Sequence, residues 1–460
     1  MTGWLPHWAN RSNAVLAYLV LVLLLGGASA AGFGGNVLLQ LLGAGLIGWT
    51  LWSHGEGHVL HTGLRRFFIA LAVLMAVQFL PLPPGLWRLL PGREVVHQGF
   101  VTLGADAPWL TLSLAPWHSL ASFAWWIPAL ALFVALRAPG GPSTRALVWT
   151  VAGVAAVSTV FSALQTGAGQ FYFYDITNYG EGPGFFANSN HQGSFLLAAL
   201  TLWGCWAIGE HRANPPLKNQ MLAPVLQAGV ALLLLTGVVV SGSLACLMLL
   251  VPVLGALFLV YKPDLRLPLP LVLLAGLAIV GGFAAFLLFG PAANDLTAKG
   301  AIAGISRQEF LATGSRILAD FFPFGSGSGT FLELYRWYED PAIVGTTYVN
   351  HAHDDLLELL IETGIFGLVA VLAFLAWYVP RSWKLWGGAR RQTMPLAAST
   401  VIGVVLLHSL VDYPLRTAAM SSIMAIACIV LVRAPDAPVA RKGSRSRRRS
   451  DGEQREMMRI

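Results

Sequence analysis

Charged residues are scarce in this sequence of 460 residues. Asp, Glu, Lys and Arg together make up 11% of the chain, whereas 56% of the residues are hydrophobic. Soluble globular domains contain about 25% charged residues. The deficit excludes a soluble globular domain and indicates a protein that lies mostly within a membrane.

Cysteine is rare, and one familiar metal motif is absent. The three cysteines, Cys205, Cys246 and Cys428, all fall inside apolar segments, so they imply no disulfide framework. The HExxH pattern of zinc peptidases does not occur in the sequence. Both absences argue against a disulfide-stapled domain and against a zinc site of that type.

Long apolar segments, in contrast, are abundant. A helix needs roughly 20 apolar residues to cross the hydrocarbon core of a bilayer. The first apolar segment resembles a signal peptide, but the many later ones favour an uncleaved first helix. We therefore expect an all-α, polytopic membrane helix bundle of about 12 transmembrane helices, at residues 13–31, 34–53, 66–83, 118–136, 146–165, 192–209, 222–240, 243–261, 267–289, 363–380, 395–411 and 417–433.

Basic residues indicate how these helices are oriented. With the N-terminus in the cytoplasm, seven of the 29 Lys and Arg residues fall on the outer side, namely Arg88, Arg93, Lys299, Arg307, Arg316, Arg336 and Arg416. The excess on the inner side is the usual positive-inside pattern. It predicts two cytoplasmic termini and a transmembrane domain over residues 1–433, within which residues 290–362 form one large outer loop.

Residues 434–460 form a basic tail that contains the run RKGSRSRRRS. We expect a disordered cytoplasmic segment that lies against anionic lipid, with binding to nucleic acid or to another protein as the alternative. The net charge of +7 comes from this tail and from residues that flank the spans. It therefore does not require a nucleic-acid ligand.

Two outer segments concentrate aromatic and amide side chains. Trp87, Trp109 and Trp117 lie in the segment 84–117, where they fit an interfacial aromatic belt or stacking on sugars. The segment 166–191 ends in a turn with Asn188, Asn190 and His191. These three side chains either cap the next helix or bind a ligand rich in hydroxyl groups.

The loop 290–362 contains two arginines and a glycine-rich turn. Arg307 and Arg316 are nine residues apart, which is 2.5 helical turns, so they point to different faces of a straight helix. Gly325, Gly327 and Gly329 alternate with serines. Backbone amides of such a loop can cradle phosphate, but the Lys-Ser/Thr ending of a nucleotide loop is missing, which favours a simple turn.

The end of this loop gathers the polar residues that are most expensive at a membrane surface. His351 and His353 stand with Asn350, Asp354 and Asp355 directly before an apolar segment. They are compatible with a metal site or with an acid-base site in which histidine acts near neutral pH. Near the chain end, Asp412 and Arg416 flank Pro414 just beyond another span, and neither side chain is expected to face lipid.

Four motifs occur in a fixed order: FFANSNH, Arg307 leading into FFPFGSGSGTF, NHAHDDLLELLIETGIFG, and DYPLR. Together they resemble the O-antigen ligase/polymerase family, multi-spanning glycosyltransferases of bacterial envelope polysaccharide assembly. The resemblance covers roughly residues 180–430 and is strongest at 307–367. One departure is Asp354, which stands where the family often has Asn.

The resemblance implies a C-type glycosyltransferase-like architecture in the bacterial inner membrane, with the 290–362 loop in the periplasm. Its members move an undecaprenyl-diphosphate-linked glycan to an acceptor hydroxyl on a glycan or on lipid A core. The product is polymerised or ligated O-antigen or exopolysaccharide, and other polysaccharide assembly proteins are further partners. The resemblance implies no cofactor and no metal.

The resemblance and the residue chemistry together define the expected site. We expect His353, with His351 as second candidate, to activate the acceptor hydroxyl. Arg307, ahead of Arg316 and Arg416, is expected to hold the diphosphate. The residues expected to bind or orient the glycan or the imidazole are Asn188, Asn190, His191, Asp354 and Asp355.

Two other classes of function stay open. A transporter or flippase of polysaccharide or lipid-linked glycan usually has repeated halves and ionisable residues near mid-span, and the sequence shows neither. A structural or assembly protein does not need an outer loop rich in His and Arg. We therefore favour a glycosyltransferase, with a polymerase slightly ahead of a ligase or a protein O-glycosyltransferase.

Overall fold

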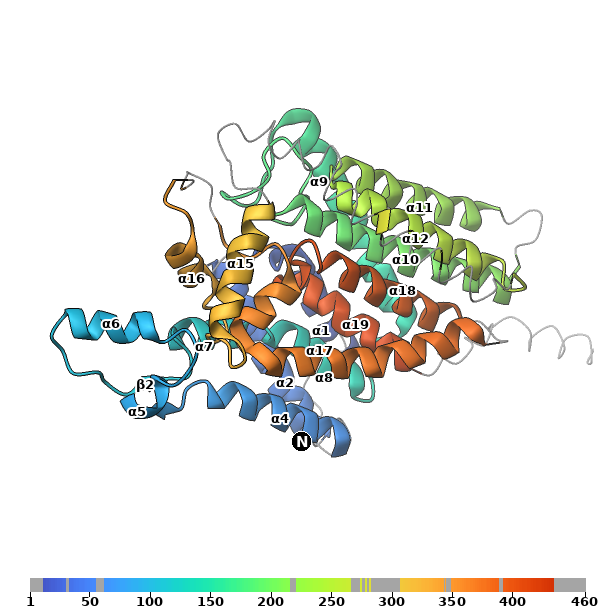
Figure 1. Cartoon of the computed structure of the whole chain (residues 1–460). Coiled ribbons are helices and arrows are strands. Elements are labelled where there is room, and N and C mark those ends of the chain that lie inside the picture. Colours follow the sequence, from blue (N-terminus) through green and yellow to red (C-terminus); the bar gives the residue numbers. More distant parts are fainter. Residues whose placement is uncertain are drawn as a thin grey trace, which may run out of the picture.

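A computed structural model describes residues 11–29, 33–54, 62–215, 221–265, 307–342, 344, 349–388 and 392–433, and four isolated positions between 266 and 306. Within these ranges the chain is a helical bundle with one short antiparallel ribbon (Figure 1). The elements are α1 (Arg11–Leu25), α2 (Gly34–His54), α4 (Thr62–Val77), β1 (Pro81–Leu82), α5 (Pro84–Trp87), α6 (Glu94–Thr102), β2 (Leu110–Thr111), α7 (Pro116–Ala124), α8 (Ile127–Arg137), α9 (Thr144–Ala168), α10 (Ser189–Ala213), α11 (Leu222–Val240), α12 (Leu244–Tyr261), α15 (Arg307–Phe321), α16 (Phe331–Tyr338), α17 (Asp355–Gly387), α18 (Thr393–His408), η1 (Pro414–Arg416) and α19 (Ala418–Val432).

Seven of the described helical segments are long and apolar enough to cross a membrane. They are α2, the α7–α8 pair, α9, α10, α11, α12 and α17. Four shorter apolar helices correspond to further predicted spans, in α1, α4, α18 and α19. Apart from four positions, the predicted span at 267–289 lies outside the described residues. The mostly helical membrane bundle is thus confirmed, while the count of about 12 spans stays a prediction.

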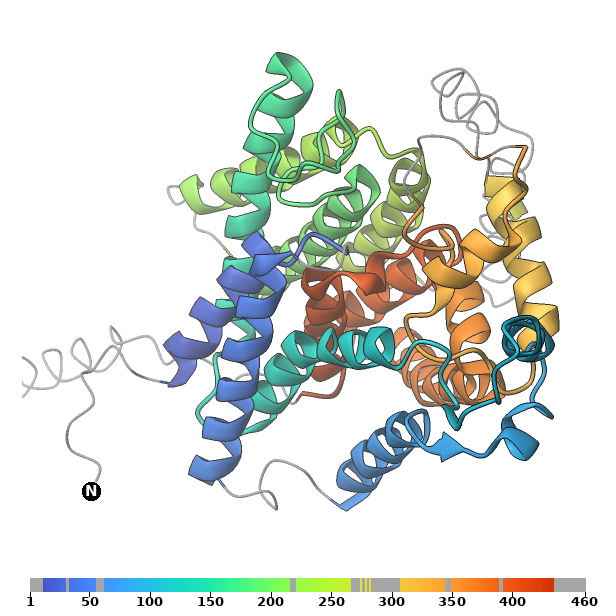
Figure 2. The same ribbon diagram turned by 90° about the vertical axis from the view of Figure 1, so that its left-hand side faces the viewer.

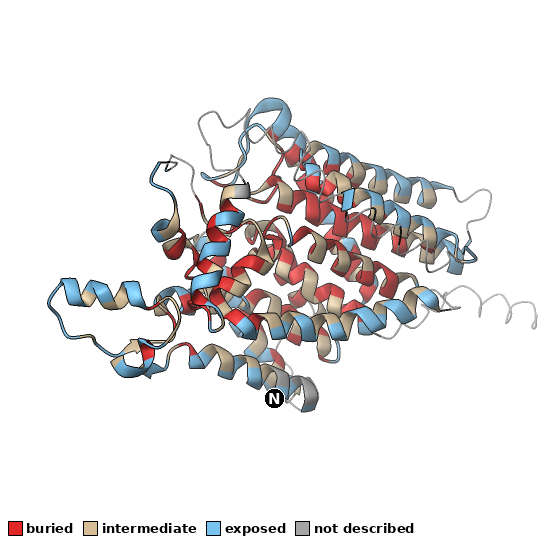
Figure 3. Cartoon of the chain, in the orientation of Figure 1, coloured by how far each residue is buried: buried red, intermediate tan, exposed pale blue. Residues whose placement is uncertain are grey.

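Helix α10 forms the centre of the bundle and packs against α9, α11, α12 and α18. Its apolar residues from Phe195 to Trp206 are buried almost without interruption. Figure 3 shows these buried residues in the middle of the molecule. A helix that is apolar all round is suited to this central place.

The outer helices expose broad apolar faces. Val225 and Leu232 on α11, and Val369 and Leu372 on α17, are all more than half exposed. Faces of this extent are rare on soluble monomers, but lipid tails cover them in a membrane protein. The exposed apolar surface therefore agrees with the membrane assignment from composition.

Helices α15 and α16 form a second, smaller layer over the start of α17. Phe310, Ile317, Phe331, Leu357 and Ile361 build a separate apolar core between them. Figure 2 shows this layer, in yellow and orange, at one side of the bundle. It covers the end of the bundle at which α17 begins and α18 ends.

Helix α17 bends at Gly364, where φ is +57° and ψ is −135°. A Cβ atom at this position would lie 2.0 Å from the carbonyl oxygen of Pro323, so only glycine fits. The amide of Ile365 donates to that same oxygen at 2.9 Å. The bend thus locks the first turns of α17 against the loop that follows α15.

Candidate functional site

Polar side chains gather where α10 and α17 begin and where α18 ends. Helix α10 supplies His191, the turn before α17 supplies His351 and His353, and the α18–α19 connection supplies Asp412 and Tyr413. Asp355 N donates to the carbonyl oxygen of Ser409 at 2.9 Å, which ties the two loops together. Three segments far apart in the sequence therefore form one cluster.

The carboxylate of Asp412 is the centre of this cluster and is fully buried. Its Oδ1 lies 3.7 Å from Nε2 of His191 and 3.5 Å from Nδ1 of His353, and its Oδ2 lies 3.9 Å from Nε2 of His408. Asn190 Nδ2 donates to Oδ2 at 2.7 Å. Burial opposes ionisation, but the imidazoles of His191 and His353 beside its oxygens hold the pKa of Asp412 well below its ordinary value.

The ring of Tyr413 fills the space among three histidines. Its centroid lies 4.8 Å from that of His191, 4.5 Å from that of His351 and 4.9 Å from that of His353. The Tyr413 hydroxyl donates to Oδ1 of Asn350 at 3.3 Å. The ring therefore fixes the spacing of the imidazoles, which are not in contact through hydrogen bonds.

His353 has an unusual backbone, with φ at +53°. This left-handed region is uncommon for residues other than glycine and costs on the order of 1–3 kcal/mol. Stacking on Phe310, at 5.0 Å between ring centroids, and the contact of Nδ1 with Asp412 oppose that cost. The imidazole is 28% exposed, against 14% for His351, so of the two it is more open to a substrate.

A second charge network lies beside the first, around Arg416. Its Nη1 lies 3.1 Å from Glu362 Oε2 and 3.3 Å from Glu358 Oε1, and its Nε lies 3.6 Å from Asp355 Oδ1. Burial lowers the pKa of Arg416, but the three carboxylates outweigh burial and raise it. Arg416 is therefore a fixed cation within an acidic cage.

His351 belongs to this second network. Its Nδ1 lies 2.9 Å from Oε1 of Glu358, whose Oε2 accepts a hydrogen bond from the amide of Ala352 at 2.8 Å. Since Glu358 also faces Arg416, the orientation of His351 is coupled to that cation. The two histidines of the NHAHDD motif thus have different acidic partners.

Asp354 and Asp355 do not orient the imidazole of His353 as we expected. Asp354 Oδ1 accepts from the amides of Leu356 and Leu357, each at 2.9 Å, and so caps α17. Asp355 Oδ2 accepts from Ser409 Oγ at 2.8 Å. Both carboxylates are held by the start of their own helix and by the neighbouring loop, and Asp412 faces His353 in their place.

Of the two roles considered for the amides at the start of α10, the structure shows the helix cap. Asn188 caps α10 by accepting from the amide of Asn190 at 2.8 Å. The side chain of Asn190 donates to Asp412 and accepts from Ser243 Oγ at 2.6 Å. These amides build the polar cluster from within, and a glycan contact through them stays a prediction.

The predicted arginines of the loop occupy separate places. Arg307 begins α15, but its side chain lies outside the described residues. Arg316 Nη2 donates to Thr313 Oγ1 and to the carbonyl oxygen of Tyr338, both at 3.1 Å, so it joins α15 to the end of α16. Among the three arginines, Arg416 alone is shown within the histidine and carboxylate cluster.

The glycine-rich segment is a turn. Its amides are used within the protein: Gly327 N donates to the carbonyl oxygen of Glu362, Gly329 N to Glu362 Oε1, and Ser328 N to Gln78 Oε1. Gly325, Gly327 and Gly329 all have positive φ. The segment therefore holds the bend of α17 and offers no such amide to a phosphate.

The tryptophans of the segment 84–117 divide into two groups. Trp87 is buried and donates from Nε1 to the carbonyl oxygen of Pro108 at 2.9 Å. Trp109 and Trp117 are 65% and 79% exposed. Only the exposed pair is available for a membrane interface or for a sugar.

Sequence reasoning missed the acidic partners of the site. Glu358 and Glu362 are one helical turn apart in an otherwise apolar segment and are nearly fully buried. Two acids one helical turn apart, directly before a predicted span, indicate that one cation pairs with both. Among the described residues, no group of three or more His, Cys, Asp or Glu side chains is placed to hold a metal ion.

The helical bundle and its buried polar cluster define a multi-pass membrane protein with a site at one end. A protein-family model described as O-antigen ligase matches residues 229–372, which include Arg307, His351 and His353. This match confirms the resemblance to the O-antigen ligase family and supports a membrane enzyme of the ligase/polymerase type in polysaccharide biosynthesis. No curated protein matches the chain.

Proposed function

We propose that the protein is an inner-membrane glycosyltransferase that moves a glycan from undecaprenyl diphosphate to an acceptor hydroxyl on the periplasmic side. The observation that carries the proposal is the His353–Asp412 pair, with 3.5 Å between Nδ1 and Oδ1. A carboxylate on one ring nitrogen orients the imidazole and raises the basicity of the other nitrogen. The partly exposed His353 then serves as base.

The proposed reaction is a single displacement at the anomeric carbon. The acceptor oxygen forms the new bond to that carbon while the bond to the diphosphate oxygen breaks. His353 takes the proton of the acceptor hydroxyl, and the electron pair of the broken bond stays on undecaprenyl diphosphate. Positioned proton transfer of this kind contributes about 10²–10⁴-fold to the rate.

The diphosphate requires a cation as its negative charge develops, and Arg307 is our first choice. The family match contains this residue, which begins α15 above the start of α17. Arg316 is tied to Tyr338, and Arg416 is surrounded by carboxylates that repel an anion. Arg416 is therefore a weaker candidate on electrostatic grounds, and Arg316 is weaker because its guanidinium is already hydrogen-bonded within the protein.

Asn188 and His191 line the α10 side of the cluster, where the glycan of the donor or acceptor would pass. We favour polymerisation of O-antigen or exopolysaccharide over ligation to lipid A core or to protein. The neighbouring genes test that preference, because the other genes of a polysaccharide operon indicate which product the operon makes. Other polysaccharide assembly proteins would then be its partners.

The purified protein in lipid, given an undecaprenyl-diphosphate-linked glycan and an acceptor glycan, tests the activity. We expect a longer glycan and free undecaprenyl diphosphate. Movement of the intact donor across the bilayer without bond cleavage would instead identify the flippase of our alternative reading. The histidine cluster would then line a transport path.

Orientation is tested separately by labelling. Single cysteines at positions 300 and 445, both outside the described residues, should react from the periplasm and from the cytoplasm, respectively. Labelling of position 445 from outside intact cells would overturn two cytoplasmic termini and place the site on the wrong side for this reaction.

A further inference from the structure

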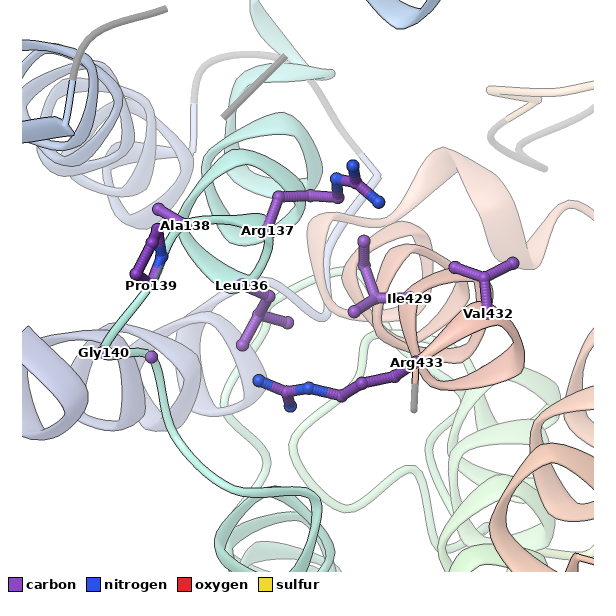
Figure 4. Close-up of a pocket in the computed structure, with 9 residues that line it drawn as sticks. Leu136, Arg137, Ala138, Pro139, Gly140, Ile429, Val432 and Arg433 are labelled. Carbon is purple, nitrogen blue, oxygen red and sulfur yellow. The ribbon is translucent and has the colours of Figure 1, made fainter. Parts of the chain in front are cut away.

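A pocket opens at the end of the bundle opposite the histidine cluster. Helix α19 begins beside Arg416 and ends at Val432, so the residue after it lies at the far end. There the ends of α8 and α19 enclose a volume of about 310 Å³. Figure 4 shows Arg137, from α8, and Arg433, after α19, on its two sides.

The two arginines of this pocket have no acidic partner in the described part of the chain. The arginines with ion pairs there are Arg336 and Arg416, and the pocket lining contains no acid. Arg137 Nε is buried there without a hydrogen-bond partner. The contrast with Arg416, which is neutralised by three carboxylates, indicates a place where an anion from outside the chain is bound.

The backbone of the connecting loop adds to this positive site. Gly140 has φ at +76°, and neither its amide nor that of Gly141 donates to a backbone or side-chain acceptor in the described ranges. Three nearby carbonyl oxygens are already occupied: Arg11 donates to those of Ala135 and Pro139, and Arg433 Nη1 donates to that of Pro142 at 3.0 Å. Free amides beside guanidinium groups, with few free acceptors, are suited to phosphate oxygens.

Apolar side chains also line the pocket. Leu136 and Ile429 lie between the two arginines, and Val432 lies to one side of them. An inorganic anion makes no use of such a surface, whereas the glycerol and first methylenes of a lipid do. We propose that the pocket binds an anionic glycerophospholipid, with the phosphate between Arg137, Arg433 and the Gly140 amide and the glycerol against Leu136 and Ile429.

The test uses the full-length protein, delipidated in detergent, with phosphatidylglycerol and phosphatidylcholine titrated in mixed micelles. Two basic residues contribute on the order of a 30-fold preference for anionic lipid. The variant Arg137→Gln/Arg433→Gln should lose about that factor for phosphatidylglycerol. Arg381→Gln is the matched control, because Arg381 is exposed and donates to the carbonyl oxygen of Trp377. The affinity of this variant for phosphatidylglycerol should equal that of the wild type.

A second pair of variants leaves both arginines in place. Open space surrounds the position of a Cβ at Gly140, and Asn and Asp both tolerate positive φ. Gly140→Asp should bind phosphatidylglycerol about fivefold more weakly than Gly140→Asn, since the two differ by one negative charge. This comparison holds even if the arginine variant fails to fold.

Three results would overturn the proposal. Equal affinity of the wild type for the two lipids would show that the protein does not recognise the charge of the lipid. Equal affinity of the two Gly140 variants for phosphatidylglycerol would show that the lipid binds elsewhere. Displacement of phosphatidylglycerol by excess inorganic phosphate would show that free phosphate, and not a lipid headgroup, is the ligand of this pocket.

Discussion

The imidazole of His353 and the carboxylate of Asp412 form the central pair of the molecule, with 3.5 Å between Nδ1 and Oδ1. His353 comes from the turn before α17 and Asp412 from the turn after α18. The pair thus exists because α17 begins beside the place where α18 ends. It leaves Nε2 of His353 as the ring nitrogen that can meet a substrate hydroxyl.

The variant His353→Ala tests the proposed base. Glycan transfer should fall by about 10²–10⁴-fold while donor binding and folding persist. His353→Asn is the better-matched variant, because Asn tolerates the positive φ of this position and keeps a polar side chain. Turnover of purified His353→Asn near the wild-type level would mean that His353 has only a structural role.

Arg307 is tested by two substitutions measured in the same transfer assay. Arg307→Ala should abolish most activity, and Arg307→Lys should restore it only in part, since lysine keeps the charge but loses the planar fork. Arg316→Ala is the control, and its effect on activity should be smaller because its guanidinium bonds Thr313 and Tyr338. If Arg307→Ala is fully active at normal expression, the diphosphate is held elsewhere.

Arg416 is expected to act on stability more than on donor binding. Arg416→Met leaves Asp355, Glu358 and Glu362 without their common cation, and loss of one partner of a buried pair costs about 3–5 kcal/mol. Arg336→Met is a matched control, since the exposed Arg336–Glu333 pair contributes at most about 1 kcal/mol. Equal melting temperatures for the two variants in detergent would contradict the acidic cage.

The lowered pKa of Asp412 predicts how the stability of the protein depends on pH. Its folded pKa lies below the unfolded value of about 3.9, so its charge stabilises the fold above that pH and this stabilisation is lost as pH falls through the folded pKa. The melting temperature of Asp412→Asn should therefore lie below that of the wild type by a constant amount between about pH 6 and pH 4.5, and the gap should close below about pH 4.

The exposed Asp320, which accepts from the Tyr338 hydroxyl, provides the control for this series. Asp320→Asn should follow the wild type across the whole pH range. A gap for Asp412→Asn that widens as pH falls below about 4.5 would have the wrong sign and would show that the carboxylate is protonated in the folded protein.

The class of protein followed from the sequence because it depends on composition alone. Few charges and long apolar segments indicated a membrane bundle, and helices α9, α10, α11 and α12 lie where the apolar segments predicted them. The family resemblance likewise rested on short motifs in a fixed order. The family match at residues 229–372 confirms it for the segment in which the motifs are strongest.

The contacts between side chains of the site could not be predicted from the sequence in the same way. Proximity in sequence favoured Asp354 or Asp355 as the acid beside His353. In the structure Asp354 caps α17, and Asp355 contacts Ser409 and Arg416. Asp412 takes their place because α17 and α18 pack side by side and bring their ends together. Composition and local spacing determine which segments enter the membrane, whereas contacts between distant segments decide which charges meet.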